Sequence, residues 1–244
     1  MIWFIASIAV QVLLIIHCVK TGRNTLWIWV LALLSFPGAI AYIAVEVLPE
    51  LFGSRAARRT ARSVKGLIDP TAGLRKAEQA VRATGDINSR QRYAEELIKQ
   101  TRHREAIDVY RSMLTGLYAT DPHLMLGLAS AQFGADDFAA ARDTLDQLIA
   151  ANPEFKSADG HLLYARALEG VGEFGKALDE YRALTEYYPG PEAAVRYARL
   201  LRAQDRKEES RTVLRALLDR TAAAPAHFRK AQREWLDEAE REAG

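Results

Sequence analysis

The sequence predicts an all-α protein in two parts: a two-helix transmembrane hairpin, and an α-solenoid of about four helix pairs closed by a C-terminal capping helix. Residues 1–52 carry only four charged side chains, whereas the rest of the chain carries sixty. After residue 52, strand-like runs are absent, and small and aromatic residues recur every 33 to 36 residues. We expect a membrane anchor over residues 1–52, a basic linker over residues 53–70 and a helical repeat domain over residues 71–244.

Two apolar runs make up the N-terminal part. The first extends from Ile2 to Val19 and the second from Thr25 to about Leu48, with a short polar loop between them. At a rise of 1.5 Å per residue, helices of these lengths span roughly 27 and 35 Å, enough to cross a hydrocarbon core of about 30 Å. We therefore expect residues 2–48 to cross the lipid bilayer twice. The first run lacks a basic start and a small-residue cleavage pattern, so removal as a signal peptide is not expected.

Basic residues predict the orientation of this hairpin. The loop between the two runs holds two basic residues, Lys20 and Arg23. The segment after the second run holds five and no acidic residue, namely Arg55, Arg58, Arg59, Arg62 and Lys65. An excess of Lys and Arg marks the cytoplasmic side, so we expect both the N-terminus and the repeat domain on the cytoplasmic side of a bacterial inner membrane. We expect the five basic side chains to contact anionic headgroups, and we expect no nucleic acid because aromatic residues are not interleaved with them.

A repeated pattern of residue sizes predicts the helix pairs. Four pairs recur: Tyr93-Ala94, Leu128-Ala129, Tyr164-Ala165 and Tyr197-Ala198. Thirteen residues after the first member of each pair come the small residues Ala106, Ala141, Ala177 and Ser210. Larger residues follow at fixed spacing: Tyr110, Leu145, Tyr181 and Leu214, then Met113, Leu148, Leu184 and Leu217. Small side chains let helices cross closely, and large ones fill the space between successive pairs.

Further helices are expected on both sides of these pairs. A short helix is predicted over residues 72–84, ended by Gly85, and turns within pairs are predicted at residues 134–137 and 170–173. At the other end, residues 224–243 predict one charged terminal helix with Phe228, Ala231, Trp235 and Leu236 along one face. A stack of repeats leaves its last apolar face uncovered, so a capping helix is expected there.

The repeated pattern resembles the tetratricopeptide repeat over about residues 87–221. Alanine replaces the usual glycine at position 8 of each repeat, and Ser210 replaces alanine in the fourth. The resemblance implies a groove lined by the first helix of each repeat, and in this register the candidate residues are Gln91, Glu95, Leu126, Ser130, Phe133, Leu162, Arg166, Val195, Arg199 and Arg202. The clamp by which chaperone-binding members hold a C-terminal carboxylate is not reproduced, so a chaperone tail is not the expected ligand.

Two interpretations of the arginines in this groove remain open. They offer charge-assisted hydrogen bonds to an acidic group of an extended peptide or helix lying in the groove. Alternatively, they only hydrate a helix face and pair with Glu169 and Glu192.

The second apolar run carries its own resemblance. It contains Trp27-Ile-Trp29, then residues 35–42 with Pro37, Gly38 and Tyr42, then Glu46. Together with the first run and the short polar loop, over about residues 3–48, it resembles the N-terminal module of phospholipase D-type cardiolipin synthases, in which a two-helix anchor precedes the catalytic domain. The H-x-K-x4-D segments of those enzymes are missing, because none of the five histidines has a lysine two residues later. The resemblance therefore implies the anchor without phospholipid synthesis.

Residue patterns typical of enzymes are absent from the sequence. The histidines do not have zinc-site spacing, phosphate-binding glycine loops are missing, and no nucleophile elbow occurs. The single cysteine, Cys18, excludes an intrachain disulfide. We expect no catalytic residue, no metal and no cofactor.

Three functions remain in consideration. The first is a non-enzymatic scaffold, tethered to the membrane, that binds a protein or peptide in the repeat groove. The second is an accessory or regulatory subunit of a membrane lipid-metabolism enzyme, docked through the transmembrane anchor. The third is an enzyme with a site that its sequence motifs do not reveal.

Overall fold

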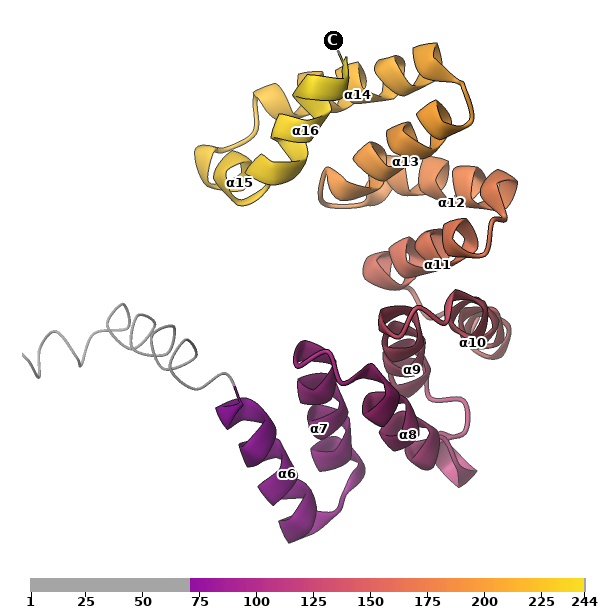
Figure 1. Ribbon diagram of the computed structural model, residues 1–244, viewed down its shortest axis with the longest axis vertical. Helices are drawn as coiled ribbons and strands as arrows, with labels where there is room; N and C mark the ends of the chain where they lie inside the picture. The colour runs from indigo at the N-terminus through magenta and orange to yellow at the C-terminus, as the bar shows by residue number, and fades with distance from the viewer. Residues whose placement is uncertain (1–70, 244) are drawn as a thin grey trace, which may run out of the picture. The chain divides into compact units, whose positions relative to one another are not determined.

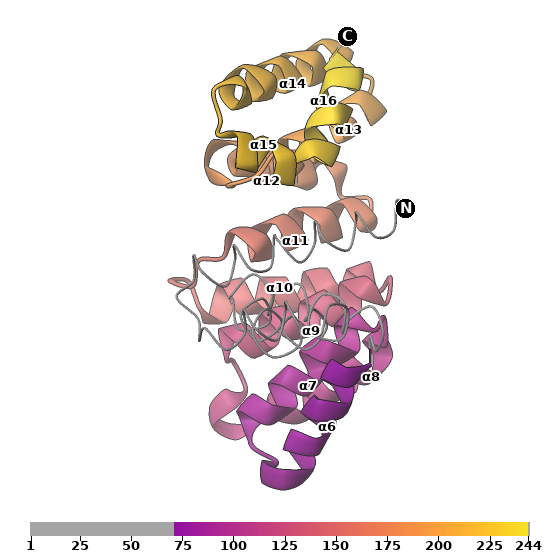
Figure 2. The same ribbon diagram turned by 90° about the vertical axis from the view of Figure 1, so that its left-hand side faces the viewer.

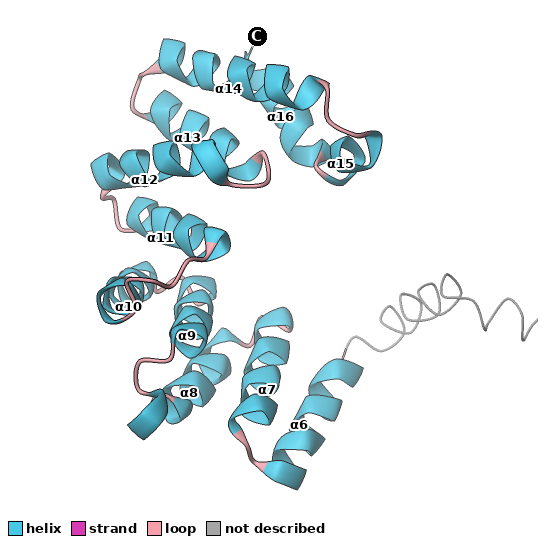
Figure 3. Ribbon diagram, turned by 180° about the vertical axis from the view of Figure 1, so that it is seen from behind, coloured by secondary structure: helices cyan, strands magenta, loops and turns pink. Residues whose placement is uncertain are grey.

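The computed structural model describes residues 71–243. The chain divides into two units, Met1–Ala72 and Gly73–Gly244, so nearly all described residues belong to the second. The described helices run in the order α6 (Ala72–Thr84), α7 (Ile87–Lys99), α8 (His103–Met113), the 3-10 helix η2 (Gly116–Tyr118), α9 (Pro122–Gly134), α10 (Phe138–Ala151), α11 (Ala158–Gly170), α12 (Phe174–Tyr187), α13 (Glu192–Ala203), α14 (Lys207–Ala222), α15 (Ala226–Ala231) and α16 (Arg233–Ala243) (Figure 1). These residues contain no strand, as the all-α prediction requires (Figure 3).

Helices α7 to α14 form four consecutive pairs, and each helix packs chiefly against its neighbours in sequence. The pairs succeed one another along the long axis of the unit (Figure 2). Helices α7, α9, α11 and α13 lie along one side of this stack, and α8, α10 and α12 lie along the other (Figures 1 and 3). We call the side formed by α7, α9, α11 and α13 the inner face.

The burial of the repeated residues confirms the predicted register. The small residues at the helix crossings are all buried, with Ala94, Ala129, Ala165 and Ala198 completely so. The larger residues between repeats are buried as well, and Tyr110, Tyr181 and Leu214 are at most 1% exposed. Apolar residues at these positions remove surface from water, which is the main stabilising contribution to a repeat stack.

The turn within each pair has the same backbone conformation. Thr101, Asp136, Gly172 and Asp205 all have positive φ, between 57° and 82°. The amide of the following residue bonds back to a carbonyl five residues earlier, as in Arg102 to Leu97 at 2.9 Å and Asp137 to Gln132 at 3.0 Å. This is the Schellman pattern, which satisfies carbonyls at the end of the first helix. The predicted turns at residues 134–137 and 170–173 are confirmed.

The expected terminal helix is divided in two, so the prediction of one helix over residues 224–243 was wrong. Helix α15 ends at Ala231 and α16 begins at Arg233. Only α16 covers the end of the stack, where Ala239 and Ala243 pack with Val195, Leu214 and Leu217. Ala231, expected on the apolar face, is exposed, because the chain changes direction at Gln232 to lay α16 on this apolar cluster.

The N-terminal predictions lie outside the described residues. They comprise the two apolar runs, the cardiolipin synthase-like segment and the basic residues Arg55 to Lys65. Among the helices of residues 71–243, none combines the length and the hydropathy that crossing a membrane demands.

Candidate functional site

Eight of the ten predicted groove residues reach the surface. Gln91, Leu126, Ser130, Phe133 and Arg166 are half-buried, and Glu95, Arg199 and Arg202 are exposed. The other two are buried, with Leu162 at 5% and Val195 at 1% exposure. The expectation that Leu162 and Val195 line an open groove was therefore wrong.

Packing of neighbouring helices explains this burial. Leu162 joins a cluster with Tyr181 of α12 and Tyr197 of α13. Val195 packs in the cluster that α14 and α16 form at the end of the stack. Sequence position alone assigns both residues to the inner side of a helix, but each lies where the next helix covers it.

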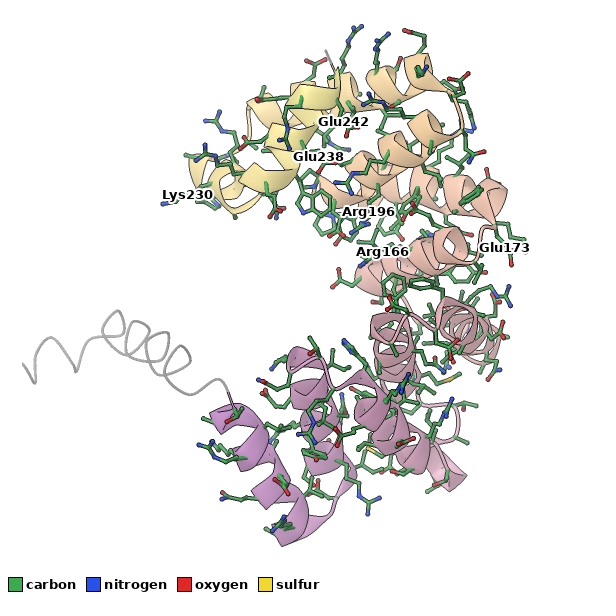
Figure 4. All side chains as sticks on the ribbon, viewed as in Figure 1. Arg166, Glu173, Arg196, Lys230, Glu238 and Glu242 are labelled. Atoms are coloured by element: carbon green, nitrogen blue, oxygen red, sulfur yellow. The ribbon has the colours of Figure 1, made fainter. Side chains whose placement is uncertain are left out.

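The two C-terminal arginines of the predicted groove already have partners. Arg199 donates from Nε to the carboxylate of Glu238, and this hydrogen bond raises the pKa of Arg199. Arg202 lies 3.6 Å from Glu242. Both glutamates belong to α16 (Figure 4). Pairing of these arginines is thus found, but with Glu238 and Glu242 rather than with Glu169 and Glu192.

Arg196 is a charged residue of this surface that the groove register did not include. Its Nε lies 2.8 Å from Glu192, and its guanidinium lies 5.3 Å from the ring centroid of Trp235. The guanidinium of Arg199 lies 5.6 Å from the same ring. The spacing of Glu192 and Arg196, four residues apart in a helix, is the sequence signal for this ion pair.

Arg166 has neither an ion pair nor a hydrogen bond within residues 71–243, and its Nε is buried without a partner. Its guanidinium lies over the ring of Phe133, 4.5 Å from the centroid. Burial, and then the charge of Arg196, lower the pKa of Arg166. Nearby carboxylates are engaged elsewhere, because Glu169 accepts a hydrogen bond from Tyr181 at 2.7 Å and Glu192 pairs with Arg196.

A pocket of about 380 Å³ lies between the second and third repeats, with walls from α9 to α12. Leu145, Leu148 and Ile149 form its apolar side, and His161, Glu180 and Tyr187 contribute polar groups. His161 Nε2 lies 2.5 Å from Glu180, and its Nδ1 contacts the Tyr187 hydroxyl. Since these groups hydrogen-bond one another, the pocket offers few free polar atoms to a ligand.

The chemistry of this pocket does not resemble a nucleophilic site. Burial, and then the charge of Glu180, raise the pKa of Tyr187, so its hydroxyl stays protonated at neutral pH. Residues 71–243 also contain no group of three His, Cys, Asp or Glu side chains placed to hold a metal ion.

Comparison with known proteins supports the repeat assignment. The tetratricopeptide repeat family model matches residues 97–167. No curated protein matches the sequence significantly.

Several solved structures have a similar fold. TTC0263, a thermophilic tetratricopeptide repeat protein of Thermus thermophilus, is 17% identical with a TM-score of 0.54, and the match covers 73% of this chain and 96% of that one. The MamA RS-1 ArsTM double mutant is 14% identical with a TM-score of 0.56, covering 69% and 95%. YrrB, a tetratricopeptide repeat protein with an unusual peptide-binding site, is 16% identical with a TM-score of 0.50, covering 68% and 91%. These likenesses concern the fold, and together with the family match they support a tetratricopeptide-like α-solenoid.

Proposed function

From a tetratricopeptide-like array as the premise, we propose that the chain is a non-enzymatic scaffold, anchored in a membrane, that binds a segment of a partner protein on its inner face. Arrays of this kind present an extended surface built from many helices, which suits a long partner segment better than a small molecule. YrrB, with its peptide-binding site, is a structural neighbour that is consistent with this role.

The observation that carries the proposal is the half-buried strip where α9 and α11 meet. Phe133 and Arg166 form a stacked aromatic–cation pair there, and Arg166 has no counter-charge within the described residues. Leu126 and Ser130 are half-buried along the same helix as Phe133. Aromatic and arginine side chains of this kind are enriched among the residues that contribute most to protein–protein binding.

The location of the scaffold is part of the same proposal. The apolar runs over residues 2–48 and the basic residues Arg55, Arg58, Arg59, Arg62 and Lys65 support a bilayer anchor whose following segment lies against anionic headgroups. The repeat domain then faces the cytoplasm of a bacterial inner membrane. A partner bound on the inner face would be held close to the bilayer.

Removal of residues 1–52 tests whether the repeat domain or the anchor carries binding. Proteins captured from membranes by the full chain are compared with those captured by the truncated chain, with circular dichroism as the control for folding. We expect the truncated chain to retain its partner. Loss of the partner from a folded truncated chain contradicts the scaffold and favours the accessory subunit of a lipid-metabolism enzyme, which docks through the anchor and which the resemblance of residues 35–42 suggests.

A further inference from the structure

The arginines of the inner face differ in their counter-charges. Arg196 pairs with Glu192, Arg199 with Glu238 and Arg202 with Glu242. Arg166 has no such partner among residues 71–243, although it is more deeply placed than Arg199 or Arg202. A half-buried cation without a partner is unfavourable, because it has lost part of its hydration and gained no charge in exchange.

Rearrangement of nearby carboxylates would not readily supply the missing charge. Glu169 is held by the hydroxyl of Tyr181, which is completely buried. Glu192 is held by Arg196, so its transfer to Arg166 would leave Arg196 unpaired instead. Arg166 therefore remains without a directly paired carboxylate, whereas Arg196 near it is paired with Glu192 (Figure 4).

The geometry of Arg166 restricts how an anion approaches it. The guanidinium carbon lies over the ring of Phe133, so the ring occupies one side of the group, and Nε is buried. An anion therefore meets the terminal nitrogens along the edge that these two nitrogens form. Two N–H groups along this edge match the two oxygens of a carboxylate.

We propose that the partner segment of the scaffold function carries a carboxylate that binds the terminal nitrogens of Arg166. This proposal rests on the proposed function, because it names the chemistry of the partner at the same inner face. An apolar side chain of the segment lies next to the carboxylate, against the exposed part of Phe133. Arg199 and Arg202 do not contribute, because Glu238 and Glu242 already neutralise them.

A peptide selection tests this subsite while the partner is unidentified. The full chain in detergent micelles is exposed to a phage-displayed library of random short peptides, and the selected peptides are synthesised with each acidic residue intact or replaced by its amide. We expect the selected peptides to share an acidic residue, and we expect its replacement by the amide to weaken binding about 10- to 100-fold. This replacement leaves the protein unchanged, so its effect does not depend on the folding of a variant.

Variants of the chain assign the effect to Arg166. Arg166→Gln should weaken the acidic peptide about 10- to 100-fold and leave the amide form unaffected, and Arg166→Lys should give an intermediate loss. Arg199→Gln is the matched control, since it removes a charge from the same face that is already paired, and should change the affinity by less than about threefold.

The remaining outcomes separate the two proposals. Selected peptides without an acidic residue, or equal affinity for wild type and Arg166→Gln, overturn the carboxylate subsite and leave the scaffold function in place. No enrichment of any peptide by a folded chain counts against the scaffold function itself, and the subsite is then overturned with it.

Discussion

The four turns within the repeats differ in the type of residue that adopts the positive φ. Gly172 adopts its positive φ of 82° without steric cost, and Asp136 and Asp205 belong to a residue type that tolerates this region. Thr101 has a φ of 57° with a β-branched side chain, which fits the left-handed conformation poorly. The hydrogen bond from Arg102 to Leu97 and the packing of α7 on α8 hold Thr101 there.

Replacing Thr101 by glycine should therefore stabilise the repeat unit. Thr101 is exposed and its side chain bonds only the carbonyl of Gln100, so little packing is lost. We expect the free energy of unfolding to rise by about 1 kcal/mol, measured by denaturant titration. Gly172→Ala makes the opposite change and should lower the free energy of unfolding by a similar amount. A Thr101→Gly variant less stable than wild type would show that the threonine is not strained.

The sequence predicts the positions of the inner-face arginines better than it predicts their ion-pair partners. The register assigned Arg166 to the first helix of its repeat, and its guanidinium lies over Phe133 of the preceding repeat. The register could not reveal that Arg199 and Arg202 pair with Glu238 and Glu242, because those partners lie about 40 residues away and depend on how α16 docks. For the same reason, reversing Arg199 and Arg202 to glutamate does not test partner binding cleanly, since like charges would then face each other across the cap.

Close helix contacts depend on residues that the sequence pattern did not single out. A Cβ atom on Gly127 of α9 would overlap the ring of Tyr110, which is only 1% exposed. Burial, and then the charge of Glu95, raise the pKa of Tyr110 to about 12, in agreement with an enclosed ring. The glycine thus makes room for the tyrosine that fills the space between the first two repeats.

Gly127→Ala should destabilise the array by about 1–3 kcal/mol, because the enclosed tyrosine ring cannot move away cheaply. Gly175→Ala in α12 is the matched control, since nothing lies within 4 Å of its added Cβ. We expect the control to raise the free energy of unfolding by about 0.5–1 kcal/mol, as alanine favours helix over glycine. Thermal or denaturant unfolding of both variants provides the measurement, and equal stabilities would contradict the packing described here.

The end of the stack illustrates an element that sequence predicts only in outline. The need for a cap follows from the exposed apolar face of the last repeat, and α16 meets it. The sequence does not predict the break between α15 and α16 at Gln232, because no glycine or proline lies there. It arises because Ala239 and Ala243 dock on α13 and α14 in a direction that α15 does not share.

The whole repeat unit follows from a simple rule of residue sizes. Buried alanines and serine at the crossings and buried tyrosine, leucine and methionine between repeats reproduce the predicted period in all four pairs. This rule concerns only spacing along the chain. It therefore does not predict that neighbouring helices cover Leu162 and Val195, or that a pocket opens beside Tyr187. Those features depend on how successive repeats tilt, which short-range spacing does not encode.

The proposed orientation of the chain in a membrane gives a prediction at the same scale. The five basic residues from Arg55 to Lys65, against two in the preceding loop, favour a cytoplasmic repeat domain. A reporter enzyme that is active only after export, fused behind Gly244, should therefore be silent. Strong activity of this fusion would invert the proposed topology.

Photo-crosslinking in membranes tests the central claim, binding at the inner face, most directly. A photoreactive phenylalanine analogue is placed at Phe133 beside Arg166, or at Phe174, which is 40% exposed at the start of α12 on the other side of the stack. Both replacements conserve an aromatic ring, so differences between them report position. We expect a discrete partner adduct from position 133 and none from position 174. An adduct from position 174 alone, or equal adducts from both positions, would contradict the inner face as the binding surface.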